Sequence, residues 1–291
     1  MSAPASLHES SVLGVADMEL LDDQEFSIVQ GVALQYFGLE ITDNKRTMLS
    51  RRMKLFARSM GMGTAGQAVR TSLVSPTKEV LVQLAVYITT NHTFFHREPQ
   101  HFERLMEDVL PAVIKLARDE EALRIWCGAA STGQEPYELA MCLEEALALK
   151  GARWKRAVLA TDISEKVLGV ARAANYTGQQ VATLPSQRLR TYLVKQADSS
   201  FTVTPKIRKL VTFGRLNLLS ATYPFRRSFQ VIFCRNVMIY FAASVRLEVL
   251  RKLSGALVLG GYLFIGRSES VRGMEETLRF VEPGVYRKIG D

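Results

Sequence analysis

Apolar and polar positions alternate along the second half of the chain in a way that predicts a layered α/β structure. Short apolar runs of strand length, bounded by Gly, Ser, Thr or Asn, are separated by segments with apolar residues at helical spacing. This cadence is typical of a mostly parallel sheet covered by helices. The predicted strands are residues 123–127, 156–163, 210–219, 229–235 and 261–266, with a short strand at 200–204 and a hairpin at 280–289. The predicted helices are residues 134–150, 164–174 and a segment around 245–253.

The first part of the chain shows only helical periodicity, and no strand pattern occurs before about residue 120. Phe26, Val29 and Ala33 mark one helix, and Ser75 followed by Pro76 is a good start for another. The predicted organisation is a disordered segment at residues 1–20, a helical domain at 21–90, a linker at 91–101 and an α/β domain at 102–291 with a β-subdomain at about 185–210.

The helix predicted over residues 44–60 is amphipathic. Arg51, Lys54 and Arg58 fall within one sector of a helical wheel, and no carboxylate occurs between Lys45 and Ala57. This sector is either a basic recognition surface or an ordinary solvated face. The opposite side is predicted to hold Met48, Leu49, Met53, Leu55, Phe56 and Met60.

The stretch from Leu123 to Tyr137 predicts a nucleotide-binding turn. A buried strand turns through Gly128 and Gly133 into a helix that carries Pro136 in its first turn. The N-terminus of such a helix has unpaired N–H groups that a ligand can approach. The GxGxxG dinucleotide fingerprint is absent, and the turn alone is a weak signal.

Two acidic residues near this turn have alternative interpretations. Asp162 ends the second predicted strand, where ribose hydroxyls are held in such folds, or it caps the following helix together with Ser164. Glu135 either faces the ligand or forms a capping box with Thr132.

Four polar or flexible positions follow the ends of predicted strands. They are Gly128, Asp162, Asn217 and Asn236. Ligands bind outside the carboxyl ends of parallel strands, so these positions predict a small-molecule site at one edge of the sheet.

The segment from Ile88 to Phe102 breaks the helical rhythm and is predicted to be a linker that lines an interdomain cleft. His92 and His96 are four residues apart, but no acidic residue stands between them as in HExxH, so no metal site is expected. Arg97 has a simple alternative role as the ion-pair partner of Glu98.

Composition narrows the class of protein. The chain has 291 residues, 47% of them hydrophobic, a net charge of +8 and a sequence pI near 9.5, so an acidic partner is plausible. Its three cysteines, Cys127, Cys142 and Cys234, lie in apolar segments, which predicts reduced thiols in a cytoplasmic protein. No apolar stretch is long enough to span a membrane.

Three motifs together are highly specific. They are Asn91-x-Thr93-x-Phe95-x-Arg97-Glu98-Pro99, residues 129–137 (AASTGQEPY) and residues 233–241 (FCRNVMIYF). With them the chain resembles, over residues 20–290, the CheR-type chemotaxis receptor methyltransferases, which are protein-glutamate O-methyltransferases. The resemblance implies a Rossmann-like domain that binds S-adenosylmethionine (SAM), releases S-adenosylhomocysteine (SAH), and follows a small helical domain.

The resemblance also implies roles for individual residues. By motif position, Asn91, Thr93 and Arg97 contact the cofactor from the linker, and Glu135 and Asp162 hold its methionine or ribose portion. The remainder is lined by Asn217, Leu218, Arg235 and Asn236. The basic helix, through Arg51, Lys54 and Arg58, docks on the acidic methylation helices in the cytoplasmic domain of a chemoreceptor.

The chain departs from the family pattern at three places. His96 stands where many relatives have Phe, and Gln134 where they often have Glu. Residues 193–204 match the inserted β-subdomain but are few and lack glycine, whereas relatives that tether to a receptor's C-terminal peptide are longer and carry glycine there. No such tethering is therefore expected.

The implied chemistry needs no strong general base. A glutamate side chain has a pKa of about 4.3 and is already a nucleophile at neutral pH. Catalysis then depends on alignment, which can contribute roughly 7 to 11 kcal/mol. Arg97 and Tyr240 are the predicted groups that hold the carboxylate.

Two other functions remain open. A nucleic-acid methyltransferase would agree with the positive charge, but residues 236–239 (NVMI) lack the two prolines of the base-gripping element, so no nucleic-acid partner is expected. The other alternative is a regulatory module that binds SAM without turnover.

Overall fold

The computed structural model describes residues 20–89, 91–116, 122–148 and 155–290. Its main element is a seven-stranded sheet in the order β6-β2-β1-β7-β8-β10-β9, whose first five strands are parallel. The strands are β1 (Leu123–Gly128), β2 (Arg156–Asp162), β6 (Val211–Arg215), β7 (Phe229–Phe233), β8 (Leu257–Phe264), β9 (Leu278–Glu282) and β10 (Val285–Lys288). The predicted α/β fold class is confirmed, and β9 and β10 form the predicted terminal hairpin.

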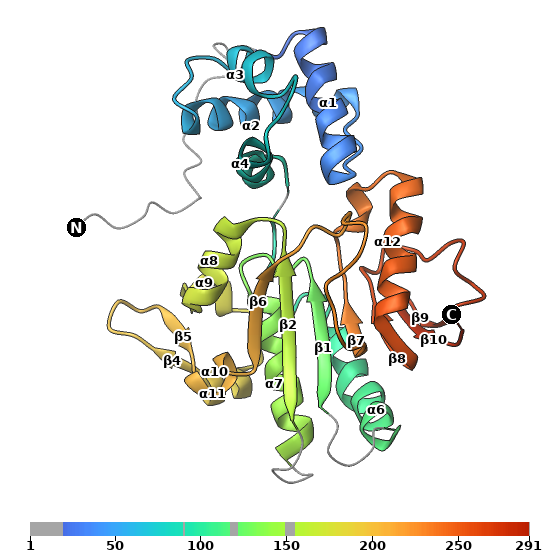
Figure 1. The fold of residues 1–291 in the computed structure, drawn as a ribbon. Coiled ribbons are helices and arrows are strands. Elements are labelled where there is room, and N and C mark those ends of the chain that lie inside the picture. The colour runs from blue at the N-terminus through green and yellow to red at the C-terminus, as the bar shows by residue number, and fades with distance from the viewer. Residues whose placement is uncertain (1–19, 90, 117–121, 149–154, 291) are drawn as a thin grey trace.

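Helices cover both faces of this sheet (Figure 1). The alternation along β1 shows how: Trp126 belongs to the core shared with α12, whereas Ile125 and Cys127 belong to the core shared with α7. The flanking elements are α5 (Pro99–Arg104), a π-helical turn η3 (Leu105–Val109), α6 (Leu110–Leu116), α7 (Gln134–Ala148), α8 (Glu165–Ala173) and α12 (Ala243–Ala256). The three cysteines are free thiols buried in the core.

The N-terminal part consists of helices and lies over the carboxyl ends of the parallel strands (Figure 1). A capping box formed by Asp22 and Glu25 starts α1. The sequence placed the start of α4 at Ser75 and Pro76, but the helix begins at Lys78 because the side chain of Thr77 accepts the capping bond. The elements are α1 (Asp23–Phe37), η2 (Asp43–Lys45), α2 (Arg46–Ser59), α3 (Ala65–Ser72) and α4 (Lys78–Ile88).

The helical part and the sheet share one hydrophobic core. Phe56 of α2 and Ile232 of β7 belong to the same buried cluster. A backbone bridge pairs Leu39 with Phe241, and the amide of Asn217 donates to the carbonyl of Tyr36 (3.1 Å). These contacts fix the helices against the loops that follow the strands. The boundaries proposed for the domains stay a prediction, and residues 1–19 lie outside the described part of the chain.

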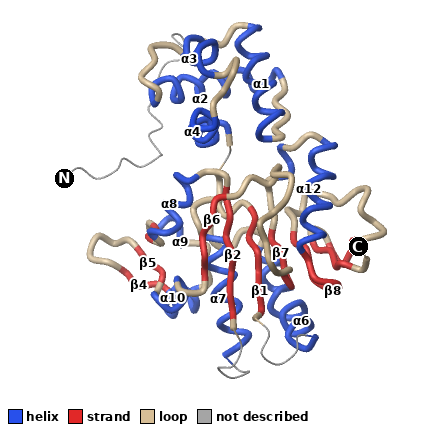
Figure 2. The backbone as a smooth tube through the Cα atoms, in the orientation of Figure 1, coloured by secondary structure: helices blue, strands red, loops and turns tan. Residues whose placement is uncertain are grey.

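A second, three-stranded sheet stands apart from the main one, as the tube in Figure 2 shows. It begins earlier in the chain than the sequence pattern indicated, at Asn175, because a two-residue strand has no readable alternation. Its elements are β3 (Asn175–Tyr176), α9 (Gly178–Val181), α10 (Ser186–Tyr192), β4 (Leu193–Lys195), β5 (Phe201–Val203) and α11 (Pro205–Arg208).

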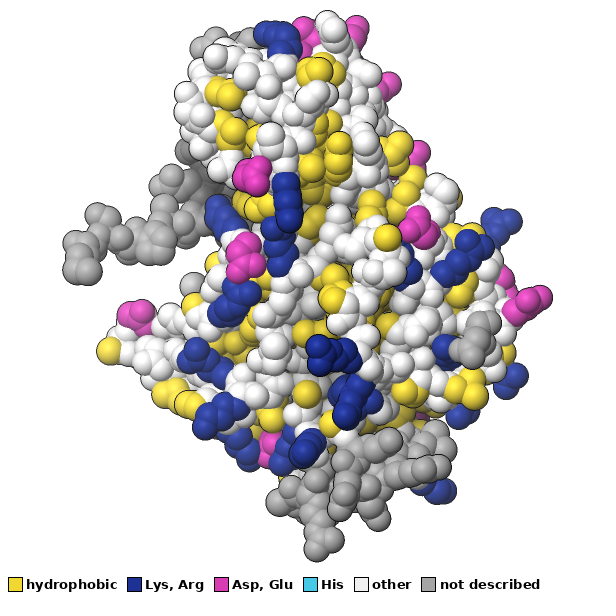
Figure 3. Space-filling model, in the orientation of Figure 1, with side chains coloured by type: hydrophobic (Ala, Val, Ile, Leu, Met, Phe, Trp, Pro, Cys, Tyr) yellow, Lys and Arg dark blue, Asp and Glu magenta, His cyan; other side chains and the backbone are white. Residues whose placement is uncertain are grey.

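The α2 helix presents its cations to solvent. Arg51, Lys54 and Arg58 are exposed, and Leu49, Met53 and Phe56 are buried. The prediction was wrong for Leu55, which is 52% exposed, and for Met48, which is 37% exposed. At 100° per residue, Leu55 and Met48 lie about 40° and 60° from Arg51, so the wheel itself places them beside the cations and not opposite them. On the face drawn in Figure 3, Lys and Arg side chains are spread over both parts of the molecule.

Candidate functional site

A cavity of about 390 Å³ lies between the N-terminal helices and the carboxyl ends of the parallel strands. Both parts of the molecule and the linker contribute to its walls. All the predicted cofactor and catalytic residues except Gly128 line it: Asn91, Thr93, Arg97, Glu135, Asp162, Asn217, Leu218, Arg235, Asn236 and Tyr240. The structure thus brings together residues from the linker and from the ends of four strands.

Gly128 lies beside the cavity but does not line it. A Cβ there would lie 3.3 Å from the Trp126 ring, so the residue faces the core rather than the cavity. The turn after it presents Ala129 and Ser131 instead. Gly133 has a φ of +96°, and a Cβ there would lie 2.8 Å from the Tyr176 hydroxyl, so only glycine fits.

Asp162 is buried at the end of β2 and ties two loops together. Its carboxylate accepts from the N–H of Ser131 (2.9 Å) and from the N–H of Ser164 (2.9 Å). Burial raises its pKa, and the backbone N–H groups oppose that shift. The hydroxyl of Ser164 makes no capping bond, so the acid both supports the start of α8 and faces the cavity.

Glu135 is turned toward an arginine and not toward a helix cap. Its carboxylate lies 3.4 Å from Nε of Arg235 and accepts from the thiol of Cys127 (3.2 Å). Thr132 instead bonds the side chain of Gln134 (2.7 Å), so the capping box is not formed. Burial raises the pKa of Glu135, and the Arg235 guanidinium opposes the shift.

Arg235 is the buried cation of the site, with 1% of its side chain exposed. It donates from Nη2 to the carbonyl of Arg97 and pairs with Glu98 at 3.5 Å. Its Nε and Nη1 atoms have no hydrogen-bond partner among the described residues. Arg97 itself donates to the carbonyl of His92 (2.9 Å), so the simple Arg97–Glu98 pair considered above is replaced by a Glu98–Arg235 pair.

Two acids of the site were missed by sequence reasoning. Glu98 has a left-handed backbone (φ +54°) and accepts from the amide of Asn236 (3.0 Å). Its sequence signals were its place beside Arg97 and its position in the motif of residues 91–99, but no site role was assigned to it. Glu269 accepts from the N–H groups of Asn236 (3.0 Å) and Ile239 (3.0 Å) and had no local signal at all. It holds the loop that carries Asn236 and Tyr240.

The helical part contributes cations to the cavity that are distinct from the residues predicted to dock the receptor. Arg51, Lys54 and Arg58 lie outside the cavity, whereas Lys45 and Arg52 line it. Arg52 donates to the carbonyl of Ile88 (2.8 Å), and burial lowers its pKa.

The position of the cavity within the fold defines the class of protein. A cavity with polar side chains in its wall, across the carboxyl ends of a doubly wound parallel sheet, is the place where Rossmann-like proteins bind nucleotides. Within the described ranges, no group of three or more His, Cys, Asp or Glu side chains could hold a metal ion. His96 is bonded to Glu138 instead (2.7 Å). No helix in those ranges is long and apolar enough to cross a bilayer.

Comparison with known proteins identifies the family. A family model described as "CheR methyltransferase, SAM binding domain" matches residues 91–286. The chain is 34% identical over 91% of its length to a chemotaxis protein methyltransferase of Borreliella burgdorferi, covering 94% of that protein. It is 35% identical to chemotaxis protein methyltransferase 1 of Pseudomonas aeruginosa (86% and 92% covered) and 33% identical to the Escherichia coli chemotaxis protein methyltransferase (95% of both). The chain belongs to the CheR methyltransferase family and is a SAM-dependent methyltransferase.

The residues of the cavity fit this cofactor. SAM combines a carboxylate, a ribose diol and an aromatic base. The Arg235 guanidinium has two nitrogens without a hydrogen-bond partner in the described chain, Asp162 offers carboxylate oxygens, and Leu218 and Ile163 supply apolar wall. The cavity volume lies in the range of small-molecule sites, roughly 300 to 1,000 Å³.

Proposed function

We propose that the protein transfers the methyl group of SAM to glutamate side-chain carboxylates of chemoreceptors and so forms methyl esters used in chemosensory adaptation. The chain matches proteins named chemotaxis protein methyltransferase over nearly their whole lengths. The observation that carries the proposal is the cavity, in which the cationic Arg97 and the phenol Tyr240 share a wall with the cofactor residues. An anionic acceptor suits that wall.

The cofactor is held, in this proposal, by the residues already described. Asn91, Thr93 and Arg97 bind it from the linker, and Glu135 and Asp162 bind the methionine or ribose portion. Leu218, Asn217, Arg235 and Asn236 complete the site. When bound, SAM supplies a methyl group made electrophilic by its sulfonium.

The protein's own task is alignment. The acceptor carboxylate is ionised at neutral pH because its ordinary pKa is about 4.3, so no residue has to remove a proton. Arg97 orients it by a charge-assisted hydrogen bond and Tyr240 by its hydroxyl.

The receptor docks on α2 in this proposal. Arg51, Lys54 and Arg58 are exposed on one face of the helix, and Met48 of the same helix lines the cavity. A cationic helix face is complementary to the acidic methylation helices of a receptor's cytoplasmic domain. The protein then acts in the cytoplasm, and no segment of it needs to enter the membrane.

We further propose that the small sheet does not bind a receptor's C-terminal peptide. The turn between β4 and β5 spans residues 196–200, contains no glycine and is closed by a bond from the N–H of Gln196 to the carbonyl of Ser200 (2.8 Å). The turn is therefore compact.

The decisive experiment incubates the protein with labelled SAM and membranes that contain candidate receptors. We expect label on the receptor as a base-labile ester. A parallel reaction with RNA tests the nucleic-acid alternative, and label there in place of the receptor contradicts the proposal. SAH binding without any transfer identifies a non-catalytic SAM-binding module.

A further inference from the structure

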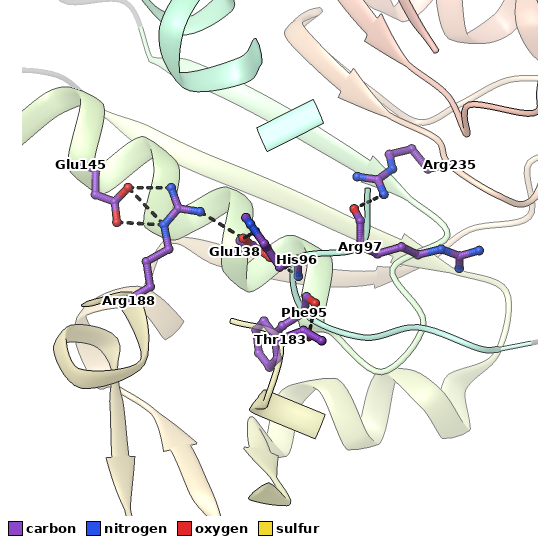
Figure 4. Close-up of polar contacts among 8 residues, drawn as sticks. All are labelled: Phe95, His96, Arg97, Glu138, Glu145, Thr183, Arg188 and Arg235. Atoms are coloured by element: carbon purple, nitrogen blue, oxygen red, sulfur yellow. Dashed lines mark hydrogen bonds and ion pairs between the residues drawn. The ribbon is translucent and has the colours of Figure 1, made fainter. Parts of the chain in front are cut away.

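A network of charged side chains lies beside the linker (Figure 4). Arg188 of α10 donates from Nη1 to Glu138 (3.0 Å) and from Nη2 to Glu145 (2.7 Å), both on α7. Glu138 also accepts from the backbone N–H of His96 (2.6 Å). None of these four residues lines the cavity. The network therefore connects the linker to side chains that lie outside the cavity wall.

The burial of the charged side chains in this network calls for an explanation other than conformational stability. The side chain of Glu138 is 0% exposed and that of Arg188 is 11% exposed. Buried ion pairs are weak evidence for stability, because desolvation offsets much of their attraction. They are, however, directional, and this one holds a single residue, because Glu138 contacts both the backbone N–H and the Nδ1 atom of His96. His96 has a left-handed backbone with a φ of +59°.

The linker is fastened on both sides of His96. The hydroxyl of Thr183 donates to the carbonyl of Phe95, whose ring packs edge-on against Tyr176 at 5.1 Å. On the other side, Arg235 donates to the carbonyl of Arg97. Three consecutive residues are thus each held by a hydrogen bond from a different part of the chain.

We propose that Glu138 and Arg188 are positioning residues of the cofactor site: through the backbone of His96 they fix the linker that presents polar groups to the cavity, and so set the affinity for the cofactor. Thr183 does the same from the segment before α10. Loss of these contacts lets the linker shift and separates Arg97 from Arg235. The inference rests on the linker's role in the proposed function, but it concerns cofactor binding and not the methyl acceptor.

The test compares Glu138→Gln and Thr183→Val with the full-length wild type. A glutamine cannot accept from His96 and Arg188 at the same time without turning its own amide donor toward one of them. We expect the Kd for SAH, measured by titration calorimetry, to rise roughly tenfold for Glu138→Gln and roughly threefold for Thr183→Val. Valine has nearly the shape of threonine, so the second variant keeps the packing and removes one hydrogen bond.

Two readouts separate positioning from folding. A purely structural role lowers the fraction of protein that binds, seen as reduced stoichiometry, but leaves the Kd of the folded molecules unchanged. Positioning raises the Kd at full stoichiometry, and the KM for SAM rises in step. Arg172→Met is the matched control, because Arg172 pairs with Glu165 on the exposed side of α8, away from the linker. Its Kd is expected to equal that of the wild type.

Wild-type Kd values at full stoichiometry for both Thr183→Val and Glu138→Gln overturn the inference. SAH binding needs no methyl acceptor, so this result is independent of whether receptors are methylated. Failure of receptor methylation with intact SAH binding counts against the proposed substrate alone.

Discussion

Three carboxyl groups around the cavity share one electrostatic situation. Glu135, Asp162 and Glu269 are all withdrawn from water, and burial raises the pKa of each. Hydrogen bonds from backbone N–H groups oppose the shift at Asp162 and Glu269, and Arg235 opposes it at Glu135. Burial of these ionisable groups therefore lowers the conformational stability of the protein, which is typical of groups placed for binding.

Glu135→Gln is expected to change how stability depends on pH. In the wild type the native state binds the Glu135 proton more tightly than the unfolded state. Between the ordinary pKa of 4.5 and the raised native value, stability from Glu135 therefore falls as pH rises. The free energy of unfolding of the ligand-free wild type, minus that of the variant, should decrease with pH across this window. Denaturant titrations at several pH values measure it, and a constant difference would falsify the assignment.

Arg97→Ala is expected to lower turnover of receptor methylation by roughly 10²-fold, because the acceptor loses its charged partner and its alignment. The label transferred from SAM to receptor membranes measures this. Arg279→Ala, which removes an exposed arginine on β9, is the control and should keep wild-type turnover. Equal methylation by both variants removes Arg97 from the mechanism.

At the scale of elements, the loop after β7 depends on one buried acid. Glu269 accepts from three N–H groups, those of Gly266, Asn236 and Ile239. The loop between Asn236 and Tyr240 contains only one short helical turn, η4 (Met238–Tyr240). Its geometry is therefore set mainly from outside the loop.

Glu269→Gln is expected to reduce both stability and cofactor affinity. An amide donor in place of one oxygen leaves a buried N–H group without its acceptor, which costs about 1 to 3 kcal/mol. Denaturant unfolding and SAH titration measure the two effects. Glu276→Gln, at an exposed position nearby, should change neither. An unchanged Kd for SAH in the first variant shows that the loop holds its shape without Glu269.

The α2 surface is expected to act on the receptor and not on the cofactor. Lys54→Glu and Arg58→Glu together should raise the KM for receptor roughly tenfold, leave the KM for SAM unchanged and weaken the salt dependence of the reaction. Arg226→Glu and Arg227→Glu together make the same charge change at an exposed site between β6 and β7 and serve as the control. Equal effects of both would mean that net charge, and not this face, attracts the receptor.

At the scale of the whole molecule, the cavity exists only because two parts of the chain share a core. Residues of the helices and of the sheet belong to one buried cluster, and the Leu39–Phe241 bridge joins their backbones beside the cavity. The small sheet, in contrast, packs at the far end of α10 and contributes no wall to the cavity.

Deleting the C-terminal peptide of a receptor is expected to leave its methylation rate unchanged. The compact turn between β4 and β5 offers no glycine-bearing loop to the peptide. The rates for the intact and the shortened receptor, measured at receptor concentrations below the KM, test this. A marked loss of rate for the shortened receptor shows that the small sheet is a docking site after all.

The sequence by itself determined the order of the strands and helices and the edge at which the site lies. Runs such as residues 229–233 are buried on both faces, so their apolar character is visible without any partner. The parallel arrangement then places Asp162 and Asn236 at one edge, and the motifs pointed to the same residues.

Only the tertiary structure decided which charges meet. Glu269 acts on Asn236 across 33 positions of the chain, and Glu138 meets His96 across 42. Such pairs leave no periodic trace, because periodicity reports the burial of a helix or strand face and not the identity of a distant partner. The entry of Arg52 into the cavity was decided in the same way, by how other elements pack against α2.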